Sequence, residues 1–290
     1  MTTEKFYKLI KFSPTSLNVL DLLRNMLINS ISSFIGRDFS DLEHLHDSVT
    51  ENEFDELHYY LTKSLWESGL HLTLMRAEMH QLQSIFGVDL DIQVRPHLRI
   101  TRPNRASDNV GLHRDIDYGA SIYEYSLWTP ISFWADGGGM QVLNDSLRKG
   151  YDGYDMFVQE TLQTKGSKKN IAGHPYKTNN VKLTPSEYAS LEEPRVDYGS
   201  CLVIPQMMVH GSELNTSGST RVSFDMRIVD ANIIDERSTL AKRKSTDSQV
   251  EFTESSYYQK FTRSYATKLA ETFKSKGNIS FEKEDNQHDK

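Results

Sequence analysis

The sequence predicts a mainly β fold, an antiparallel sandwich or jelly roll with flanking helices. Between residues 92 and 230, short runs of alternating apolar residues are separated by Gly, Asn, Asp and Ser rather than by regular helices. This pattern is typical of antiparallel sheets and disfavours a βαβ fold, in which helices alternate with strands. Before residue 92, apolar residues recur at helical spacing, so we expect helices to pack against the sheet.

The helical N-terminal region is expected over residues 1–91. Its first helix should begin at Ser13-Pro14, because proline is tolerated in a first helical turn. The apolar face of that helix consists of Leu17, Leu20, Leu23, Leu27 and Ile31. Thr50 and Glu53 form a capping box ahead of a second helix, and a third helical run extends from about residue 71 to residue 87.

The jelly-roll core is expected over residues 92–230. In its first strand one face carries Val94, Pro96, Leu98 and Ile100, and the other face carries Gln93, Arg95, His97, Arg99 and Thr101. Further strand-like runs cover 111–118, 121–134, 139–143, 200–210 and 220–230. Residues 148–195 interrupt this pattern with a polar stretch, which we interpret as a lid-like insertion or as a solvated loop.

The remaining chain should form a C-terminal extension over residues 231–281. Residues 255–274 contain aromatic and leucine side chains at helical spacing, which predicts a packed C-terminal helix. Residues 282–290 are charged and are expected to be a disordered tail. We therefore expect a single domain that spans residues 1–290.

The net charge and composition disfavour some classes of binding partner and indicate a cellular location. The net charge of -7 disfavours nucleic acid and anionic membranes, which attract basic proteins. The single cysteine, Cys201, excludes an internal disulfide and fits a reducing cytosol. An apolar signal sequence and a run of about 18 apolar residues are both missing, so we expect a cytoplasmic protein. The sequence leaves the oligomeric state open.

A metal site is predicted from two separated segments. His113 and Asp115 form an H-x-D, and on a strand residues i and i+2 share a face. A second strand ends at His210, and a turn after it would make residues 200–230 a hairpin. That hairpin would return Arg221 beside His210 and place Ser223 on the same face as Arg221.

This donor set favours one chemistry. Two histidines and one carboxylate occupy one face of an octahedral ion, which is typical of iron(II) oxygenases. The three open positions can take a bidentate 2-oxo acid and dioxygen. The guanidinium of Arg221 can bind the distal carboxylate of 2-oxoglutarate in a bidentate manner, and the hydroxyl of Ser223 can add a donor.

The motifs also resemble a known family, the Fe(II)/2-oxoglutarate-dependent oxygenases of the phytanoyl-CoA dioxygenase-like superfamily. His113-Arg-Asp115 matches its H-x-D, and the segment that begins His210-Gly-Ser matches its distal histidine segment. Arg221-x-Ser223 with Arg227 matches its co-substrate strand. The helical N-terminal region and overall layout are similar to oxygenases from bacterial sugar or aminoglycoside biosynthetic clusters. The resemblance implies a double-stranded β-helix, which is a distorted, cupin-like jelly roll.

Several further residues are candidates for binding. Gln93 and Arg99 either face solvent or line the barrel mouth, where they would bind substrate or co-substrate. Arg114, Tyr118 and Trp134 flank the proposed site and are candidate substrate contacts. Arginines cluster at positions 95, 99, 102, 105 and 114. If these face the cavity they indicate an anionic substrate, such as a phosphorylated or nucleotide-linked sugar, and otherwise they form a solvated basic face.

The expected function is that of an iron(II)- and 2-oxoglutarate-dependent dioxygenase. It would hydroxylate a small polar metabolite with O2 and release succinate and CO2. Asp115 disfavours halogenation, because related halogenases lack this carboxylate. Two alternatives stay open: a metal-dependent cupin-type isomerase or epimerase, and a non-catalytic jelly-roll binding protein.

Overall fold

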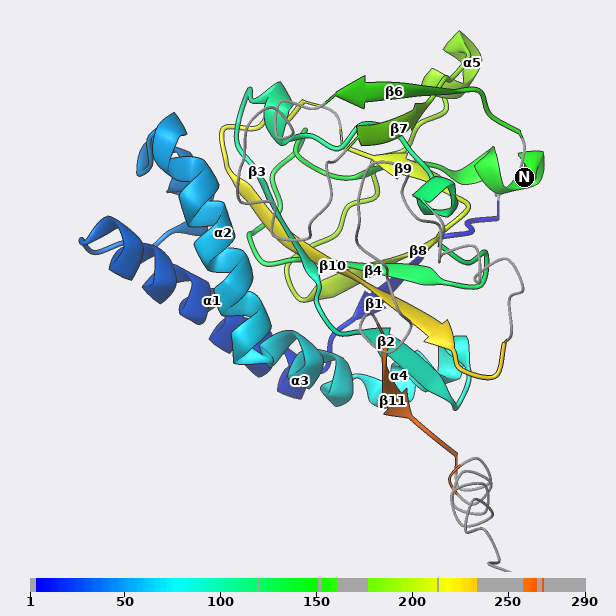
Figure 1. Ribbon diagram of the computed structural model, residues 1–290, viewed down its shortest axis with the longest axis horizontal. Coiled ribbons are helices and arrows are strands. Elements are labelled where there is room, and N and C mark those ends of the chain that lie inside the picture. Colours follow the sequence, from blue (N-terminus) through cyan, green and yellow to red (C-terminus); the bar gives the residue numbers. More distant parts are fainter. Residues whose placement is uncertain are drawn as a thin grey trace, which may run out of the picture.

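The structure is a computed structural model that describes residues 4–118, 120–150, 153–160, 177–212, 214–233, 258–264 and 268. The described helices lie mainly before residue 90, and the strands follow in antiparallel sheets. Figure 1 shows α1 and α2 side by side next to β3 and β10, with β6 and β7 at a distance from them. The mainly β fold with flanking N-terminal helices is therefore confirmed.

The N-terminal helices begin and end where the sequence indicates. Ser13 caps α1 (Pro14–Ile35), and a capping box of Thr50 and Glu53 begins α2 (Glu51–Ser68). The third helical run is divided at Glu78 into α3 (Leu70–Ala77) and α4 (Met79–Phe86). A 3-10 helix, η1 (Leu42–Asp47), connects α1 to α2. None of the described helices is long and apolar enough to cross a membrane.

The large sheet has the strand order β1-β8-β4-β10-β2-β11, and β3 also pairs with β10. Its strands are β1 (Lys8–Lys11), β2 (Leu90–Gln93), β3 (His97–Thr101), β4 (Tyr125–Pro130), β8 (Ser200–Pro205), β10 (Arg221–Asp230) and β11 (Tyr258–Thr262). All of the pairings within it are antiparallel.

Two smaller sheets complete the described strands. One pairs β5 (Gln141–Leu143) with β9 (Val209–Gly211), and the other pairs β6 (Met156–Glu160) with β7 (Lys177–Val181). The remaining short helices are η2 (Ala106–Asp108), η3 (Asp115–Tyr118), η4 (Asn144–Lys149) and α5 (Pro185–Tyr188).

The two faces of β10 have different surroundings. Its even-numbered residues, Val222, Phe224, Met226 and Ile228, are buried against α1–α4 in the main apolar core. Its odd-numbered residues, Arg221, Ser223, Asp225 and Arg227, point to the opposite face because side chains alternate along a strand. A second apolar cluster lies on that inner face and joins Trp128 of β4 and Ile204 of β8 to Val142 of β5. The inner face of the large sheet and the β5–β9 sheet therefore enclose a polar interior.

The predicted hairpin over residues 200–230 is wrong. β8 and β10 do not pair with each other, because β4 lies between them and pairs with both. β9 leaves the large sheet and pairs with β5. Apolar residues of β4 bury against both neighbours, which the local turn sequence does not reveal.

Two other secondary-structure predictions also need correction. The expected first strand is divided into β2 and β3, with Pro96 in the interruption, where its missing N–H removes a ladder hydrogen bond. The predicted C-terminal helix is wrong over residues 258–262, which form β11 and pair with the otherwise open edge of β2, whereas Lys268 is helical and donates to the carbonyl of Ser264. The described part of the insertion 148–195 contains β6, β7 and α5, whereas its residues 151–152 and 161–176 and the tail 282–290 lie outside the described residues.

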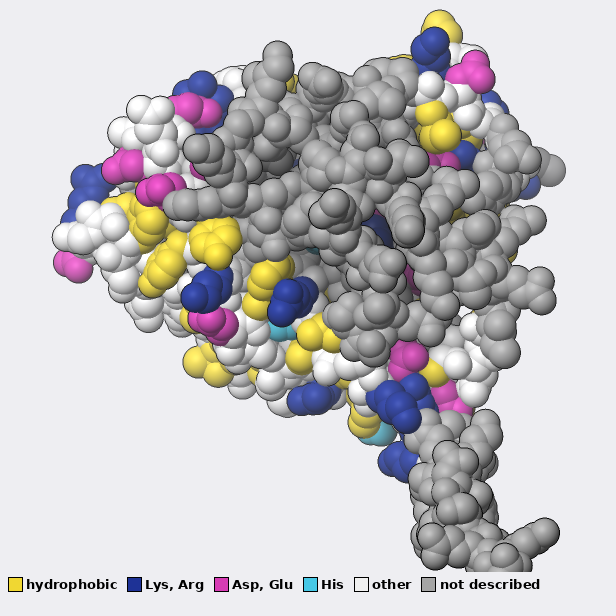
Figure 2. All heavy atoms as spheres, in the orientation of Figure 1, with side chains coloured by type: hydrophobic (Ala, Val, Ile, Leu, Met, Phe, Trp, Pro, Cys, Tyr) yellow, Lys and Arg dark blue, Asp and Glu magenta, His cyan; other side chains and the backbone are white. Residues whose placement is uncertain are grey.

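The described surface around α1 and α2 carries interspersed basic and acidic side chains (Figure 2). Some of these charges belong to ion pairs, such as Lys63 with Glu67 along α2. Exposed pairs of this kind contribute little to stability.

Candidate metal centre

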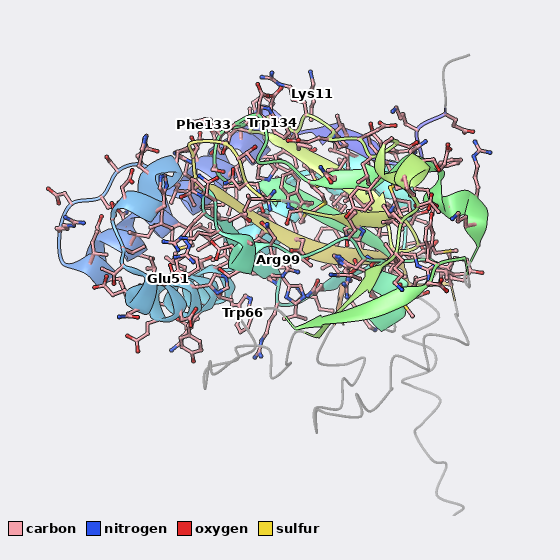
Figure 3. The ribbon with its side chains drawn as sticks, turned by 90° about the horizontal axis from the view of Figure 1, so that it is seen from above. Lys11, Glu51, Trp66, Arg99, Phe133 and Trp134 are labelled. Atoms are coloured by element: carbon pink, nitrogen blue, oxygen red, sulfur yellow. The ribbon has the colours of Figure 1, made fainter. Side chains whose placement is uncertain are left out.

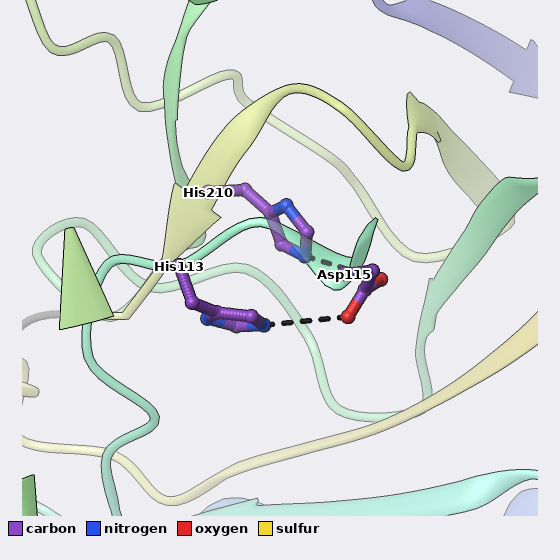
Figure 4. A group of neighbouring side chains, drawn as sticks. All are labelled: His113, Asp115 and His210. Carbon is purple, nitrogen blue, oxygen red and sulfur yellow. Dashed lines mark ion pairs between the residues drawn. The ribbon is translucent and has the colours of Figure 1, made fainter. Parts of the chain in front are cut away.

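Three side chains that the sequence predicts as metal ligands meet in the interior. Donor atoms of His113, Asp115 and His210 all lie within 4.8 Å of one another, and all three residues are buried. Figure 4 shows both imidazoles directed at the carboxylate of Asp115. The Nε2 atom of His113 is 3.5 Å from Asp115 Oδ1, and the Nε2 atom of His210 is 3.7 Å from Asp115 Oδ2.

The backbone brings the two histidines together directly. His113 and His210 form an isolated antiparallel bridge in which each N–H donates to the other's carbonyl, at 2.8 and 2.9 Å. Side chains of directly opposed residues project to the same face. The two rings therefore lie with their centroids 4.5 Å apart.

Asp115 reaches the site from a turn rather than from a strand. The sequence predicted a strand over 111–118, but the chain enters the 3-10 helix η3 at Asp115. Arg114 and Asp117 form a buried ion pair at 2.9 Å that closes this turn. The prediction that His113 and Asp115 converge is thus correct, whereas the strand proposed to explain it is wrong.

Hydrogen bonds orient both imidazoles for metal binding. The Nδ1 atom of His113 lies 2.7 Å from the carbonyl of Gly111, and that of His210 lies 2.9 Å from the carbonyl of Met208. A carbonyl can only accept, so each Nδ1 carries the proton and each Nε2 presents a lone pair to the centre. Burial lowers the pKa of His210 to about 4, which keeps this ring neutral.

Asp115 remains ionised in this buried position. Burial would raise the pKa of Asp115, but the guanidinium of Arg227 opposes burial and the pKa lies well below its usual range. Arg227 Nη2 lies 2.9 Å from Asp115 Oδ1. Ser126 Oγ donates to Asp115 Oδ2 at 3.0 Å. The site therefore offers two imidazole nitrogens and one anionic oxygen.

The donor set fits a six-coordinate ion such as iron(II). Donors about 2.1 Å from an ion lie about 3.0 Å apart when they occupy adjacent octahedral positions. One ligand atom from each of the three residues lies within 4.8 Å of the other two, so the site contracts when an ion binds. Two imidazoles and a carboxylate on one side of the ion leave its other positions open.

A cavity opens from the three ligands and extends to Arg221. Its wall includes His113, Asp115 and His210 together with Arg99, Thr101, Asp108, Val110, Ser126, Trp128, Met140, Ile204, Gly211, Ser212, Arg221 and Asp225. The structure thus brings Arg221 into the same cavity as the candidate ligands, although not through the hairpin that the sequence indicated. A molecule that contacts Arg221 can also reach the metal position.

Arg221 is held in place without a carboxylate. Its guanidinium donates to the carbonyl of Gly138 and, at 2.9 Å, to Thr101 Oγ1, and it lies over the ring of Trp128. Among the described residues no carboxylate oxygen lies within 4.0 Å of it. Burial and the nearby Arg99 together lower the pKa of Arg221 to about 10, against an opposing effect of Glu193.

Polar atoms near Arg221 lack hydrogen-bond partners. The Nε atom of Arg221, the Nε1 atom of Trp128 and the Oγ atom of Ser223 are buried, and none has a partner within the described part of the chain. Buried donors are normally satisfied, so three together indicate a region that receives a polar ligand. Ser223 lies on the same face of β10 as Arg221, as the sequence predicted.

The remaining predicted binding residues lie in different places. Arg99 lines the cavity and pairs with Asp225 at 3.0 Å. Gln93 lies outside the cavity wall, since its side-chain amide bonds to the backbone of Arg95 and Arg227. Arg114 pairs with Asp117 in η3 rather than facing the cavity.

Of the two aromatic candidates, only Trp134 can be placed relative to the cavity, and it does not line the cavity. Trp134 donates from Nε1 to Asp136 at 2.7 Å and borders a separate hollow with Phe133. Figure 3 places Trp134 next to Phe133 at one edge of the molecule, apart from Arg99. The side chain of Tyr118 lies outside the described part of the structure.

Residues that contact Asp115 were not assigned roles from the sequence. Arg227 was recognised only as part of a motif, and Ser126 and Gln206 were not singled out. The strand alternation contained a usable signal for Arg227, because it follows Arg221 and Ser223 at even spacing and must share their face. Ser126 and Gln206 depend on pairing between strands and carry no local signal.

Comparisons with known proteins find structural likeness only. No family model and no curated protein matches the sequence. The fold is similar to the non-heme monooxygenase ThoJ without ligand, at 12% identity and a TM-score of 0.46 over 77% of this chain and 74% of that one. It is also similar to EctD from S. alaskensis, at 13% identity and a TM-score of 0.46 over 80% and 76%.

A further similar structure is EvdO2 from Micromonospora carbonacea var. aurantiaca complexed with 2-oxoglutarate, at 11% identity and a TM-score of 0.44 over 80% of this chain and 91% of that one. At such low identity and TM-score, function is argued from the geometry of the site itself.

Proposed function

We propose that this chain is an iron(II)- and 2-oxoglutarate-dependent dioxygenase. His113, Asp115 and His210 would hold the iron, and Arg221 would bind the distal carboxylate of 2-oxoglutarate. The bound iron would supply the oxidising chemistry that uses O2 and releases succinate and CO2. One observation carries the proposal: a cation without a carboxylate partner among the described residues shares a cavity with two imidazoles and a carboxylate.

The chemistry of the cavity matches the two ends of 2-oxoglutarate. The 2-oxo acid end is a bidentate oxygen ligand, which suits the open side of a metal held by three protein donors. The distal carboxylate suits a fixed guanidinium, and the unsatisfied atoms Trp128 Nε1 and Ser223 Oγ lie on the strands beside it. Arg221 is therefore satisfied when the co-substrate binds.

The arrangement of the sheets supports the finer description of the fold as a double-stranded β-helix. In such a jelly roll, two facing antiparallel sheets enclose the site, as the inner face of the large sheet and the β5–β9 sheet do here. We also propose that residues 1–290 form one domain, since α1–α4 bury their apolar faces against the large sheet.

The substrate is proposed to be a small polar metabolite that is uncharged where it enters the cavity. Most of the clustered arginines are paired: Arg99 with Asp225, Arg102 with Asp108 and Glu51, and Arg114 with Asp117. Paired guanidinium groups have little free charge for a phosphate. This favours a sugar-like or other hydroxylated substrate over a phosphorylated or nucleotide-linked one.

The test is an anaerobic titration of the metal-free protein with Fe(II) and then 2-oxoglutarate. The proposal predicts a weak visible charge-transfer band that needs both additions and that decays when O2 is admitted with formation of succinate. A cupin-type isomerase would bind metal without this band, and a non-catalytic binding protein would show neither band nor succinate. Absence of the band in protein that has bound iron would reject the proposal.

A further inference from the structure

A largely buried ion pair lies outside the cavity, next to the segments that carry Arg221. Arg24 of α1 and Glu43 of η1 pair in a bidentate manner, with Nη1 3.0 Å from Oε1 and Nη2 2.7 Å from Oε2. Their side chains are only 11% and 12% exposed. The described residues that line the cavity include neither of them. Because desolvation offsets most of the attraction in a buried pair, net stability alone is a poor reason for burying these charges.

Both members of the pair hold the loop that follows β4. Oε1 of Glu43 accepts the N–H of Phe133 at 2.6 Å, and Nη1 of Arg24 donates to the carbonyl of Ile131 at 2.8 Å. Arg24 also lies over the ring of Phe133, with 4.6 Å between Cζ and the ring centroid. Residues 131–133 are thus attached to α1 and η1 through side chains that fix each other.

The same elements hold both chain neighbours of Arg221. On one side, the backbone carbonyl of Glu43 accepts the N–H of Thr220 at 2.7 Å. On the other side, the N–H of Ile131 donates to the carbonyl of Val222 at 2.8 Å. The backbone at Arg221 is therefore fixed from the residue before it and from the residue after it.

Two further contacts act in the same direction. Oγ1 of the buried Thr220 accepts the N–H of His46 in η1 at 3.2 Å. The loop that the ion pair holds continues to Gly138, whose carbonyl accepts from the guanidinium of Arg221. The backbone of Arg221 and one acceptor of its side chain thus depend on elements outside the cavity.

We propose that Glu43, paired with Arg24, is a positioning residue that sets where the guanidinium of Arg221 lies in the cavity. A flexible side chain binds a carboxylate more tightly when its ordering is achieved before the ligand arrives. Holding the backbone on both sides of Arg221 supplies that ordering. This inference rests on the proposed function, in which Arg221 binds the distal carboxylate of 2-oxoglutarate.

A double-mutant cycle tests the inference. Glu43→Ala removes the ion pair, and Arg221→Ala removes the group that Glu43 is proposed to position. Each protein is loaded with Co(II) and titrated with 2-oxoglutarate while the visible Co(II) spectrum is followed. Glu43→Ala should lower the affinity for 2-oxoglutarate about tenfold when Arg221 is present and less than about twofold in the Arg221→Ala background. The affinity for Co(II) should stay within about twofold of wild type.

Two further variants accompany the cycle. Asp91→Ala removes a partly buried ion pair with Arg263 at the opposite end of β10, so it should leave the affinity for 2-oxoglutarate within about twofold of wild type. Thr220→Val keeps the shape of the side chain but removes the hydroxyl that bonds to η1. It should lower the affinity for 2-oxoglutarate about threefold, and it carries the test if Glu43→Ala does not fold.

The outcomes separate positioning from a general effect on folding. Equal losses of affinity with and without Arg221 would overturn the proposal, and so would wild-type affinity in both Glu43→Ala and Thr220→Val. Amide hydrogen exchange of the metal-free protein needs no co-substrate. Glu43→Ala should raise exchange about tenfold over residues 131–139 and 219–224 but not over β8, and wild-type exchange in those two segments would overturn the proposal. Failure of the wild-type Co(II) protein to bind 2-oxoglutarate would instead reject the proposed function.

Discussion

Arg227 Nη2 lies 2.9 Å from Asp115 Oδ1, in a position where both side chains are largely shielded from solvent. Arg221 lies on the same face of the same strand, but it has no carboxylate partner within the described residues. The two guanidinium groups of β10 therefore differ in function. One neutralises a candidate metal ligand, and the other is available to a ligand carboxylate.

Substitution Arg227→Met should destabilise the metal-free protein. Removing one partner of a buried ion pair leaves the Asp115 carboxylate uncompensated, which typically costs about 3–5 kcal/mol. A bound cation would replace the lost charge, so Mn(II) should raise the melting temperature of the variant more than that of wild type. Urea unfolding and thermal melts with and without Mn(II) measure both effects.

The matched control for that experiment is Arg148→Met, which removes an exposed Arg–Asp pair. We expect it to change the unfolding free energy by less than about 1 kcal/mol. Equal stabilities of the Arg227→Met variant and wild type would show that the buried pair is not formed.

Substitution Arg221→Ala should raise the concentration of 2-oxoglutarate needed for half-maximal turnover. Loss of a charged hydrogen-bonded partner costs about 1.5–3 kcal/mol, which corresponds to about 10- to 100-fold. The half-saturating concentration of the Arg221→Lys variant should lie between those of wild type and Arg221→Ala, because an ammonium keeps the charge but lacks the bidentate geometry. Fe(II) affinity should not change. An Arg195→Ala variant, at an exposed position, serves as control. If Arg221→Ala needs no more 2-oxoglutarate for half-maximal turnover than wild type does, Arg221 does not bind the co-substrate.

The pH dependence of stability should contain a contribution from His97. Burial lowers the pKa of His97 to about 4, against an opposing effect of Asp225. In the unfolded chain the histidine binds its proton with a pKa near 6.5. The buried, neutral His97 therefore contributes its full stabilisation above that pH. As the pH falls toward 4, the free energy of unfolding should decrease by up to about 3 kcal/mol from this residue. Urea unfolding of wild type and His97→Gln between pH 7 and 5 should show that the free energy of unfolding falls less steeply with decreasing pH in the variant. Parallel curves would contradict the assignment.

The packing of α1 predicts a sharp contrast within one helix. Leu27 is fully buried in the main apolar core, whereas Leu22 is 58% exposed. Leu27→Ala should lower the unfolding free energy by about 2–5 kcal/mol, and Leu22→Ala by less than about 0.5 kcal/mol. Similar losses at the two positions would mean that the helix packs through a different face.

Local sequence signals predicted the helices and the three candidate ligands, because these depend on neighbouring residues. The capping residues Ser13 and Thr50 define where α1 and α2 begin. His113 and Asp115 are two residues apart, and their convergence survives a change from strand to turn. His210 comes close to them through a backbone bridge to His113.

Long-range pairing accounts for what the sequence did not predict. The insertion of β4 between β8 and β10 replaced the expected hairpin and brought Ser126 beside Arg227. The open edge of β2 drew residues 258–262 into a strand despite their helical spacing. Gln93 and Arg114 are not among the residues that line the cavity, because Gln93 bonds to backbone groups and Arg114 pairs with Asp117, and the sequence gives no local signal for the Gln93 contacts.

The central claim is that His113, Asp115 and His210 hold one ion. Anomalous diffraction at the iron edge, from crystals grown anaerobically with Fe(II), tests it most directly. The account predicts one peak per chain, about 2.0–2.3 Å from the Nε2 atoms of both histidines and from one oxygen of Asp115. A peak elsewhere in the chain, or iron bound by fewer than these three residues, would contradict it.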